Sequence, residues 1–183
     1  MCDKCEEKKD YGKTLNLPKT DFPMRANLPE REPEIEKEVF EDDLYEKMLK
    51  KNEGHESFVL HDGPPYANGE IHIGHALNKI LKDTIVRYKN LNGYYTPFIP
   101  GYDTHGMPTE NKAIQALGLN RDEIPVSEFR DTCKSFNKDY IAKQTEGFKR
   151  LGVLADWENP YITYQPQMEA KQVGVFADMY KKG

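Results

Sequence analysis

The segment SFVLHDGPPYANGEIHIGHALNKILKD, residues 57–83, contains the change of hydrophobic period that decides the fold. Residues 57–62 form a short apolar run that ends at Gly63-Pro64-Pro65, which is typical of a buried strand. From Gly74 onward the pattern is helical: one face carries Leu77, Ile80, Leu81, Thr84, Ile85 and Tyr88, while Lys79, Lys82, Asp83 and Lys89 lie elsewhere. The segment therefore predicts a strand, a loop and an amphipathic helix that ends near Asn92-Gly93.

A second strand is expected directly after this helix. Residues 94–100, YYTPFIP, indicate a short strand, residues 101–108 a loop, and residues 109–117 a helix closed by Gly118. Strand, helix, strand and helix in this order form a βαβ unit, which implies a parallel sheet with a right-handed crossover. The predicted fold class is therefore α/β.

The residues before this unit predict an extended arm followed by charged helices. Residues 1–28 show little periodicity, and prolines recur every few residues in residues 17–34, where Phe22 and Met24 are candidate anchors for the arm. Residues 33–51 predict one or two charged helices with a thin apolar stripe, formed by Leu44, Met48 and Leu49.

The residues after the βαβ unit predict two further helices. A long helix is expected from an N-cap at Ser127 to a stop at Gly152. The stretch LADWENPYITYQP, residues 154–166, appears without a regular period and is expected to be irregular. Pro166 then opens a final helix, since proline is favoured in the first turn.

The composition argues against several classes of protein. The 183 residues carry a formal net charge of −5, so the chain has no overall positive field that would attract nucleic acid. No apolar run approaches the roughly 20 residues of a membrane span, and residues 1–12 lack the hydrophobic stretch of a signal peptide. Three cysteines without a secretion signal favour a reducing cytoplasm.

Cys2 and Cys5 form a Cys-x-x-Cys pair that allows two interpretations. The pair could be half of a zinc site or a redox pair, although the sequence has no second Cys-x-x-Cys and no βαβ pattern nearby. It could also belong to a frayed chain terminus, which is the interpretation that we favour.

His72 and His75 are placed at the predicted start of a helix, beyond the end of a parallel strand, where α/β proteins bind ligands. A helix N-terminus offers unpaired N–H groups and positive dipole potential, and Gly74 lets a flat ring or a phosphate approach the backbone. Imidazole N–H groups can also follow charge that develops on phosphate oxygens. Two other interpretations stay open: the pair could cap the helix, or it could bind a metal with ligands drawn from Cys2, Cys5, Asp103 and His105.

Two motifs and the arm carry a resemblance to a known family. PPYANGEIHIGH, residues 64–75, resembles the first signature of class I aminoacyl-tRNA synthetases, and Tyr-Ala-Asn-Gly before His-Ile-Gly-His resembles the isoleucyl-tRNA synthetase family. The valyl family has Asn-Val-Thr-Gly in that place, and the leucyl family has Pro-Ser-Gly. PGYDTHGMPTE, residues 100–110, resembles the isoleucyl pattern Pro-Gly-Trp-Asp-x-His-Gly-Leu-Pro-Ile-Glu, and residues 17–34 resemble that family's N-terminal extension.

The resemblance implies a Rossmann-like nucleotide-binding fold and isoleucine–tRNA ligase activity. In that family isoleucine and ATP form isoleucyl-adenylate, and the acyl group then passes to tRNA(Ile). His72 and His75 would be catalytic residues that bind the ATP phosphates and the transition state, while Gly74 makes room for the adenine. The implied ATP-binding residues are Pro65, Tyr66, Ala67, Asn68, Gly69, Glu70, Ile71, His72, Ile73, Gly74 and His75. Mg²⁺ would accompany the ATP, held mainly by phosphates and water.

The resemblance also implies an amino-acid site around the second motif. Asp103 would pair with the ammonium group of isoleucine, with His105 beside it, and the branched side chain would meet a rigid apolar wall of Gly63, Pro64 and Pro65. No metal ligands are assigned in this chain, although zinc is possible elsewhere in a full-length enzyme. The second motif departs from the family pattern at three positions that bear on the pocket's shape: Tyr102 replaces Trp, Met107 replaces Leu and Thr109 replaces Ile.

The resemblance further implies that the chain is an N-terminal fragment. The Lys-Met-Ser-Lys-Ser signature, the editing domain and the anticodon-binding helices of the family are absent from it. Residues 1–52 are expected to form the arm and charged helices, and residues 53–183 the first half of the catalytic domain. Such a fragment should not charge tRNA by itself, and the full-length enzyme should be a cytoplasmic monomer.

Two alternative functions stay open at this point. A small nucleotidyltransferase of the same superfamily would need a second phosphate-binding motif near its C-terminus, and the sequence shows none. An ATP-binding module without catalysis would need only the first motif.

Overall fold

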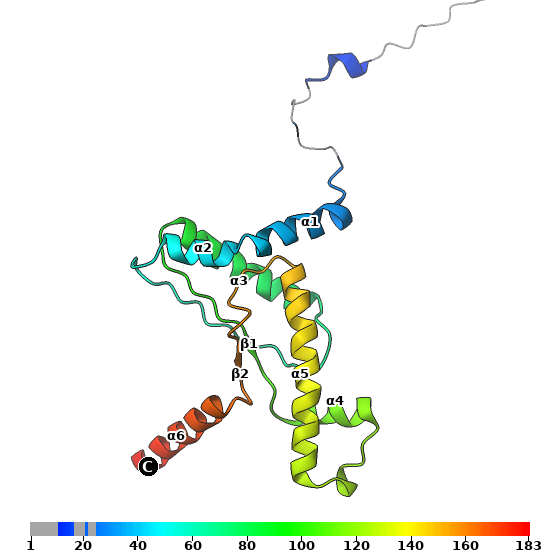
Figure 1. Cartoon of the computed structure of the whole chain (residues 1–183), viewed down its shortest axis with the longest axis vertical. Helices are drawn as coiled ribbons and strands as arrows, with labels where there is room; N and C mark the ends of the chain where they lie inside the picture. The colour runs from blue at the N-terminus through cyan, green and yellow to red at the C-terminus, as the bar shows by residue number, and fades with distance from the viewer. Residues whose placement is uncertain (1–10, 17–20, 22–24) are drawn as a thin grey trace, which may run out of the picture.

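The computed structural model describes residues 11–16, 21 and 25–183, and Figure 1 shows how their helices and strands follow one another. Cys2, Cys5, Phe22 and Met24 lie outside the described residues, so the interpretations offered for them stay predictions. In chain order the elements are η1 (Tyr11–Thr14), α1 (Leu28–Glu41), α2 (Leu44–Lys51), α3 (Ile73–Leu91), β1 (Gly101–Tyr102), α4 (Met107–Leu117), η2 (Arg121–Glu123), α5 (Val126–Arg150), β2 (Tyr161–Ile162) and α6 (Pro166–Lys182).

The helices follow the predicted order, with small differences at their ends. α1 begins at Leu28, five positions before the predicted start, with a proline in its first turn, where the missing N–H costs no hydrogen bond. Gly118 and Gly152 end α4 and α5 in left-handed conformations, with φ of 63° and 74°. The predicted N-cap at Ser127 is wrong, because Pro125 takes that position and α5 begins at Val126.

The predicted parallel pairing is confirmed, but the strands are short and lie partly elsewhere. β1 pairs with β2 in parallel, Gly101 opposite Tyr161, and isolated parallel bridges join Ser57 to Tyr95 and Tyr66 to Asp103. Residues 57–62 and 94–100 are therefore extended segments rather than full strands. Prolines in and after these segments lack the N–H that a ladder needs, which explains why pairing is interrupted.

β2 corrects the prediction that residues 154–166 are irregular. Leu154 and Ala155 in the same stretch are buried. The core has two clusters that Trp157 joins: one is formed by Val86, Phe98, Val153 and Ala155, the other by Ala67, Tyr102 and Phe148. The stretch thus supplies a strand and part of the core.

In the described residues α3 buries a mixed face, which carries Lys79, Val86 and Asn90. Its apolar face, from Leu77 to Tyr88, is the side that an amphipathic helix would bury. Leu77 and Tyr88 are instead 61% and 64% exposed, whereas Lys79 is 2% exposed. On the buried side of α3, Lys79 and Lys82 pair with Asp62, which is itself 1% exposed.

Asp62 is the centre of a buried polar network. Its carboxylate accepts hydrogen bonds from Lys79, from Lys82 at 2.7 Å and from the backbone N–H of Gly101 at 3.0 Å. Tyr161 donates its hydroxyl to the backbone oxygen of Asp62. Burial lowers the pKa of the Lys79 ammonium, and the charge of Asp62 opposes this shift. Asp62 therefore joins α3 and β1 through its carboxylate, and β2 through its backbone carbonyl.

Gly101 shows how closely the two strands approach. A Cβ at this position would lie 2.1 Å from Cζ of Tyr161, so only glycine leaves room for the tyrosine ring. α4 lies beside the N-terminal half of α5, whereas α6 extends away from the other elements in Figure 1. Among the described helices, none is long and apolar enough to cross a membrane.

Candidate functional site

A cavity of about 530 Å³ opens at the N-terminus of α3. Six of its lining residues come from the segment predicted to bind ATP: Tyr66, Asn68, Gly69, Glu70, His72 and His75. The remaining lining residues come from two other helices, Lys112, Gln115 and Ala116 from α4, and Phe136 and Tyr140 from α5. The structure thus brings half of the first motif to one concave surface, beside a helix end that favours anions.

The two histidines form a reciprocal cap of α3. The Nδ1 of His72 accepts the backbone N–H of Gly74 at 3.1 Å, and the Nδ1 of His75 accepts the backbone N–H of His72 at 3.3 Å. Their rings stack with centroids 3.8 Å apart. Because each Nδ1 accepts a hydrogen bond, a neutral ring carries its proton on Nε2. The capping interpretation is thereby confirmed, and each ring keeps an Nε2–H donor.

Gly74 has its own geometric reason to be glycine. A Cβ there would lie 3.0 Å from Cε1 and 3.1 Å from Nδ1 of His72. The space above Gly74, which the sequence assigned to an adenine ring, is used here by the imidazole of His72. A larger residue would push this imidazole away and weaken the cap.

The cap should make the stability of the chain depend on pH. Burial, then the neighbouring His72 and Lys79, lower the pKa of His75 below its ordinary value of 6.5. The unfolded chain therefore binds more protons between that lowered pKa and 6.5, so stability falls as pH decreases through this window. Thermal unfolding at about pH 7.5 and about pH 5.5 measures this loss.

His75→Gln is the matched variant, because glutamine can accept the same backbone N–H in a capping box without titrating. We expect the melting temperature of His75→Gln to fall less between these pH values than that of the unmodified chain. Equal falls in both proteins would contradict a titrating cap.

Asp103 lies directly beside the loop of the first motif. Its backbone N–H donates to the carbonyl of Pro65, and its carbonyl accepts the N–H of Ala67, both at 2.8 Å. Its half-buried carboxylate accepts weak hydrogen bonds from the hydroxyl of Thr163 and the N–H of His105, both at 3.4 Å. Asp103, the proposed partner of the ammonium group, is therefore hydrogen-bonded through its backbone to Pro65 of the proposed apolar wall.

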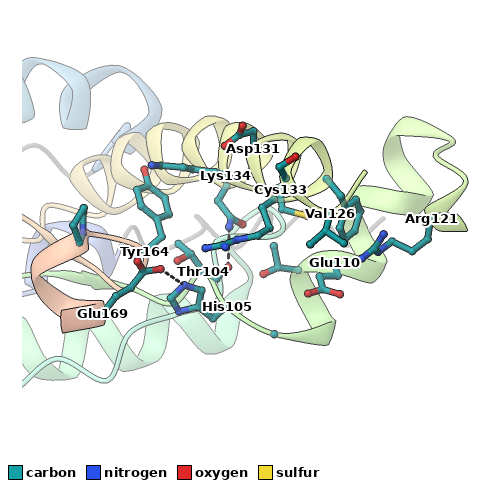
Figure 2. A pocket seen from close by; sticks show the side chains of 17 residues that line it. Thr104, His105, Glu110, Arg121, Val126, Asp131, Cys133, Lys134, Tyr164 and Glu169 are labelled. Atoms are coloured by element: carbon teal, nitrogen blue, oxygen red, sulfur yellow. Dashed lines mark hydrogen bonds and ion pairs between the residues drawn. The ribbon is translucent and has the colours of Figure 1, made fainter. Parts of the chain in front are cut away.

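His105 lines a different cavity from the two capping histidines. This second cavity, of about 510 Å³, lies between α4, α5 and the start of α6, and Figure 2 shows His105 turned towards Glu169. The Nε2 of His105 is 3.5 Å from a carboxylate oxygen of Glu169. Gly63 and Pro64 line neither cavity, so the predicted site residues are divided between several places.

The three departures from the family pattern have different surroundings. Tyr102 is fully buried and shares a hydrogen bond of 2.6 Å with Thr145, and burial raises its pKa to about 12. Thr109 is 1% exposed and lines the second cavity, whereas Met107 is 72% exposed. Tyr102 therefore contributes to the core, and only Thr109 of the three faces a cavity described above.

Sequence reasoning missed the contributions of α4 and α5 to the first cavity. Lys112, Gln115 and Ala116 follow a spacing of three and four residues, and Phe136 and Tyr140 follow a spacing of four, with ring centroids 4.8 Å apart. Such spacings place side chains on one helical face. These spacings were visible in the sequence, but nothing in the sequence indicates which face of α4 or α5 meets the first motif.

Metal ligands were another open interpretation of the histidine pair. Within residues 11–16, 21 and 25–183, the structure shows no group of three or more His, Cys, Asp or Glu side chains that could hold a metal ion. Cys133, on α5, has a free thiol that lines the second cavity, and burial raises its pKa.

Known proteins resemble this chain closely in sequence. Isoleucine–tRNA ligases of Carboxydothermus hydrogenoformans and Thermoanaerobacter pseudethanolicus are each 60% identical to it over 174 residues, which are 95% of this chain and 19% of each ligase. The isoleucine–tRNA ligase of Moorella thermoacetica is 59% identical over the same coverage. The chain therefore spans about a fifth of the length of these curated relatives.

A solved structure shares the fold of this chain, and a family model places the chain in a family. A LeuRS of Agrobacterium radiobacter, solved in a ternary complex with tRNA and LeuAMS, matches with a TM-score of 0.66 at 24% sequence identity, over 87% of this chain and 18% of that one. This likeness concerns the fold alone and confirms the predicted partial Rossmann-like fold. The model of the tRNA synthetases class I (I, L, M and V) matches residues 34–183. Because this match covers more than half of the sequence, the chain belongs to the class I tRNA synthetases.

Proposed function

We propose that this chain supplies the first half of the ATP site of an isoleucine–tRNA ligase. The observation that carries the proposal is the cavity at the N-terminus of α3, where His72 and His75 lie at the positive end of the helix dipole. Relatives about 60% identical are named isoleucine–tRNA ligases, which supports isoleucine as the amino acid. The full-length enzyme would use ATP, isoleucine and tRNA(Ile), and would act as a monomer in the cytoplasm.

The proposed reaction needs alignment and charge stabilisation rather than a base. A carboxylate oxygen of isoleucine attacks the α-phosphorus of ATP, pyrophosphate leaves, and isoleucyl-adenylate forms. The carboxylate is already ionised, so the protein's task is to hold the phosphates and stabilise the charge that builds on their oxygens. The Nε2–H groups of His72 and His75 and the ammonium of Lys112 are donors that line this cavity. Mg²⁺ would neutralise further phosphate charge.

The division of the chain follows from the same proposal. Residues 53–183 would form half of the nucleotide-binding domain, and residues 1–52 an N-terminal arm with two charged helices. The pairing of the βαβ unit supports this boundary, because the first parallel bridge begins at Ser57. ATP would then lie between this half and segments of the longer enzyme.

Isoleucine would lie between Asp103 and the loop of Gly63, Pro64 and Pro65. The backbone hydrogen bond between Asp103 and Pro65 keeps a carboxylate next to an apolar wall, which suits a ligand with an ammonium group and a branched side chain. His105, whose side chain lines the second cavity, would act on the amino acid only through the hydrogen bond from its backbone N–H to the carboxylate of Asp103.

Asp103→Asn in the full-length enzyme should raise the KM for isoleucine about 30-fold and the KM for ATP by less than about 3-fold. Losing a charged partner of an ammonium group costs on the order of 2 kcal/mol. Isoleucine-dependent exchange of pyrophosphate into ATP measures both constants. Asp139→Asn, at an exposed carboxylate of α5, is the control. An unchanged KM for isoleucine would place Asp103 outside the site.

The same exchange assay tests the proposed function itself. A full-length enzyme that carries residues 1–183 should exchange pyrophosphate with isoleucine, and should charge tRNA(Ile). Exchange with leucine or methionine in place of isoleucine would contradict the proposed substrate, and no exchange with any amino acid would contradict the proposed chemistry.

A further inference from the structure

Gln144 of α5 holds the loop that leads into the first cavity. Its Nε2 donates to the backbone carbonyl of Tyr66 at 2.9 Å and to that of Gly69 at 2.8 Å. The side chain is 1% exposed. The amide therefore uses both of its N–H groups on two main-chain carbonyls that are three residues apart. A single side chain thus fixes the shape of this turn.

The same face of α5 also lines the cavity. Phe136 and Tyr140 lie on its wall, and Gln144 is four residues further along the helix. Residues four apart in a helix share a face, so the helix that forms the wall also anchors the loop. Ile71, just before the capping histidines, packs towards Gly147 on the next turn of α5, where a Cβ would lie 2.7 Å from its Cδ1.

The chemistry of Gln144 is unusual for a residue that only fills the core. Within the described part of the chain, its Oε1 is buried without a hydrogen-bond partner. An unpaired buried acceptor is unfavourable, and an apolar side chain of equal length would avoid it. Gln144 thus donates two hydrogen bonds to the loop, although its Oε1 is left without a donor among the described residues.

We propose that Gln144 is a positioning residue for ATP, which acts by holding the main chain of Tyr66 to Gly69 in place against the two histidines. Gln144 does not line the cavity, so its proposed role is to act through the loop rather than by touching the nucleotide. This role rests on the proposed function. It also identifies α5 as the support that keeps the loop in a shape that admits a nucleotide.

Gln144→Met tests the role in the full-length enzyme, because methionine keeps the length of the side chain and removes both donors. We expect the KM for ATP in pyrophosphate exchange to rise roughly 10-fold, while the KM for isoleucine changes by less than about 3-fold. Gln167→Met, at an exposed glutamine of α6, is the matched control and should leave both constants unchanged. An unchanged KM for ATP, or equal rises in both constants, would overturn the positioning role.

Gln144→Glu gives a second test that does not depend on the methionine variant folding. An ionised carboxylate would face two carbonyl oxygens, and burial would raise its pKa. Its protonated form regains one donor. The kcat/KM for ATP, relative to the unmodified enzyme, should therefore rise as pH is lowered from about 8 to about 6. A pH-independent ratio would overturn the proposal, whereas an unmodified enzyme without any exchange would overturn the proposed function and this role together.

Discussion

Asp62→Ala is expected to lower the free energy of unfolding by about 3–5 kcal/mol, because it leaves a buried ammonium without a partner. Lys79 is 2% exposed and has Asp62 as its ion-pair partner. The backbone N–H of Gly101 loses its acceptor in the same variant. Urea denaturation followed by circular dichroism measures the change.

Asp42→Ala is the control for this experiment. Asp42 lies 2.7 Å from Lys47, a shorter contact than many ion pairs, but both side chains are more than half exposed. Water screens such a pair, so its loss should cost no more than about 1 kcal/mol. A similar loss of stability in the Asp42 and Asp62 variants would show that burial does not set the strength of the Asp62 network.

His72→Ala and His75→Ala should each slow adenylate formation about 10²-fold, or on the order of 3 kcal/mol, in the full-length enzyme. Donors aimed at the α-phosphate gain most when charge builds on its oxygens, so the rate should suffer more than substrate binding. Single-turnover formation of isoleucyl-adenylate at saturating ATP measures the chemical step directly. A chelator that spares Mg²⁺ should leave the rates unchanged.

The capping role of these histidines requires a separate control. Loss of a helix cap alone destabilises a protein by about 1 kcal/mol, which thermal unfolding would reveal. His55→Ala, at an exposed histidine that contacts the carbonyl of Gly93 beyond the other end of α3, should leave adenylate formation unchanged. If both His72→Ala and His75→Ala form adenylate at the normal rate, the pair only caps the helix or binds ATP in the ground state.

The helices could be predicted from the sequence because their signals are local. Gly118 and Gly152 end helices through their own backbone conformation, and Pro166 opens one through its ring. The pairing of β1 with β2 could not be predicted in the same way. Its two strands have two residues each and come from distant parts of the chain, so no period marks them.

The orientation of α3 is the clearest failure of pattern reasoning. The hydrophobic period predicted the helix but not the side that it buries here, which carries Lys79, Val86 and Asn90. Asp62 looked like an ordinary strand-end residue. Lys79 and Lys82, three residues apart on α3, were the only indication that this helix could present charge to a buried partner.

The candidate site was predictable only where its residues are contiguous. The loop and the capping histidines form one segment, and the structure places six of them around one cavity. Lys112, Phe136 and Gln144 reach the same region from other helices, and their contribution depends on how those helices pack. His105 was assigned to the amino acid by its place in a motif, but alternation along the chain turns it towards Glu169.

The buried network around Asp62 also sets an order of events during synthesis. Lys79 and Lys82 follow Asp62 by 17 and 20 residues, whereas Tyr161 follows it by 99. At about 5–20 residues per second, both lysines emerge within about 1–4 s of Asp62, and Tyr161 only after about 5–20 s. The nascent chain can therefore neutralise this carboxylate with α3 well before β2 exists to cover it.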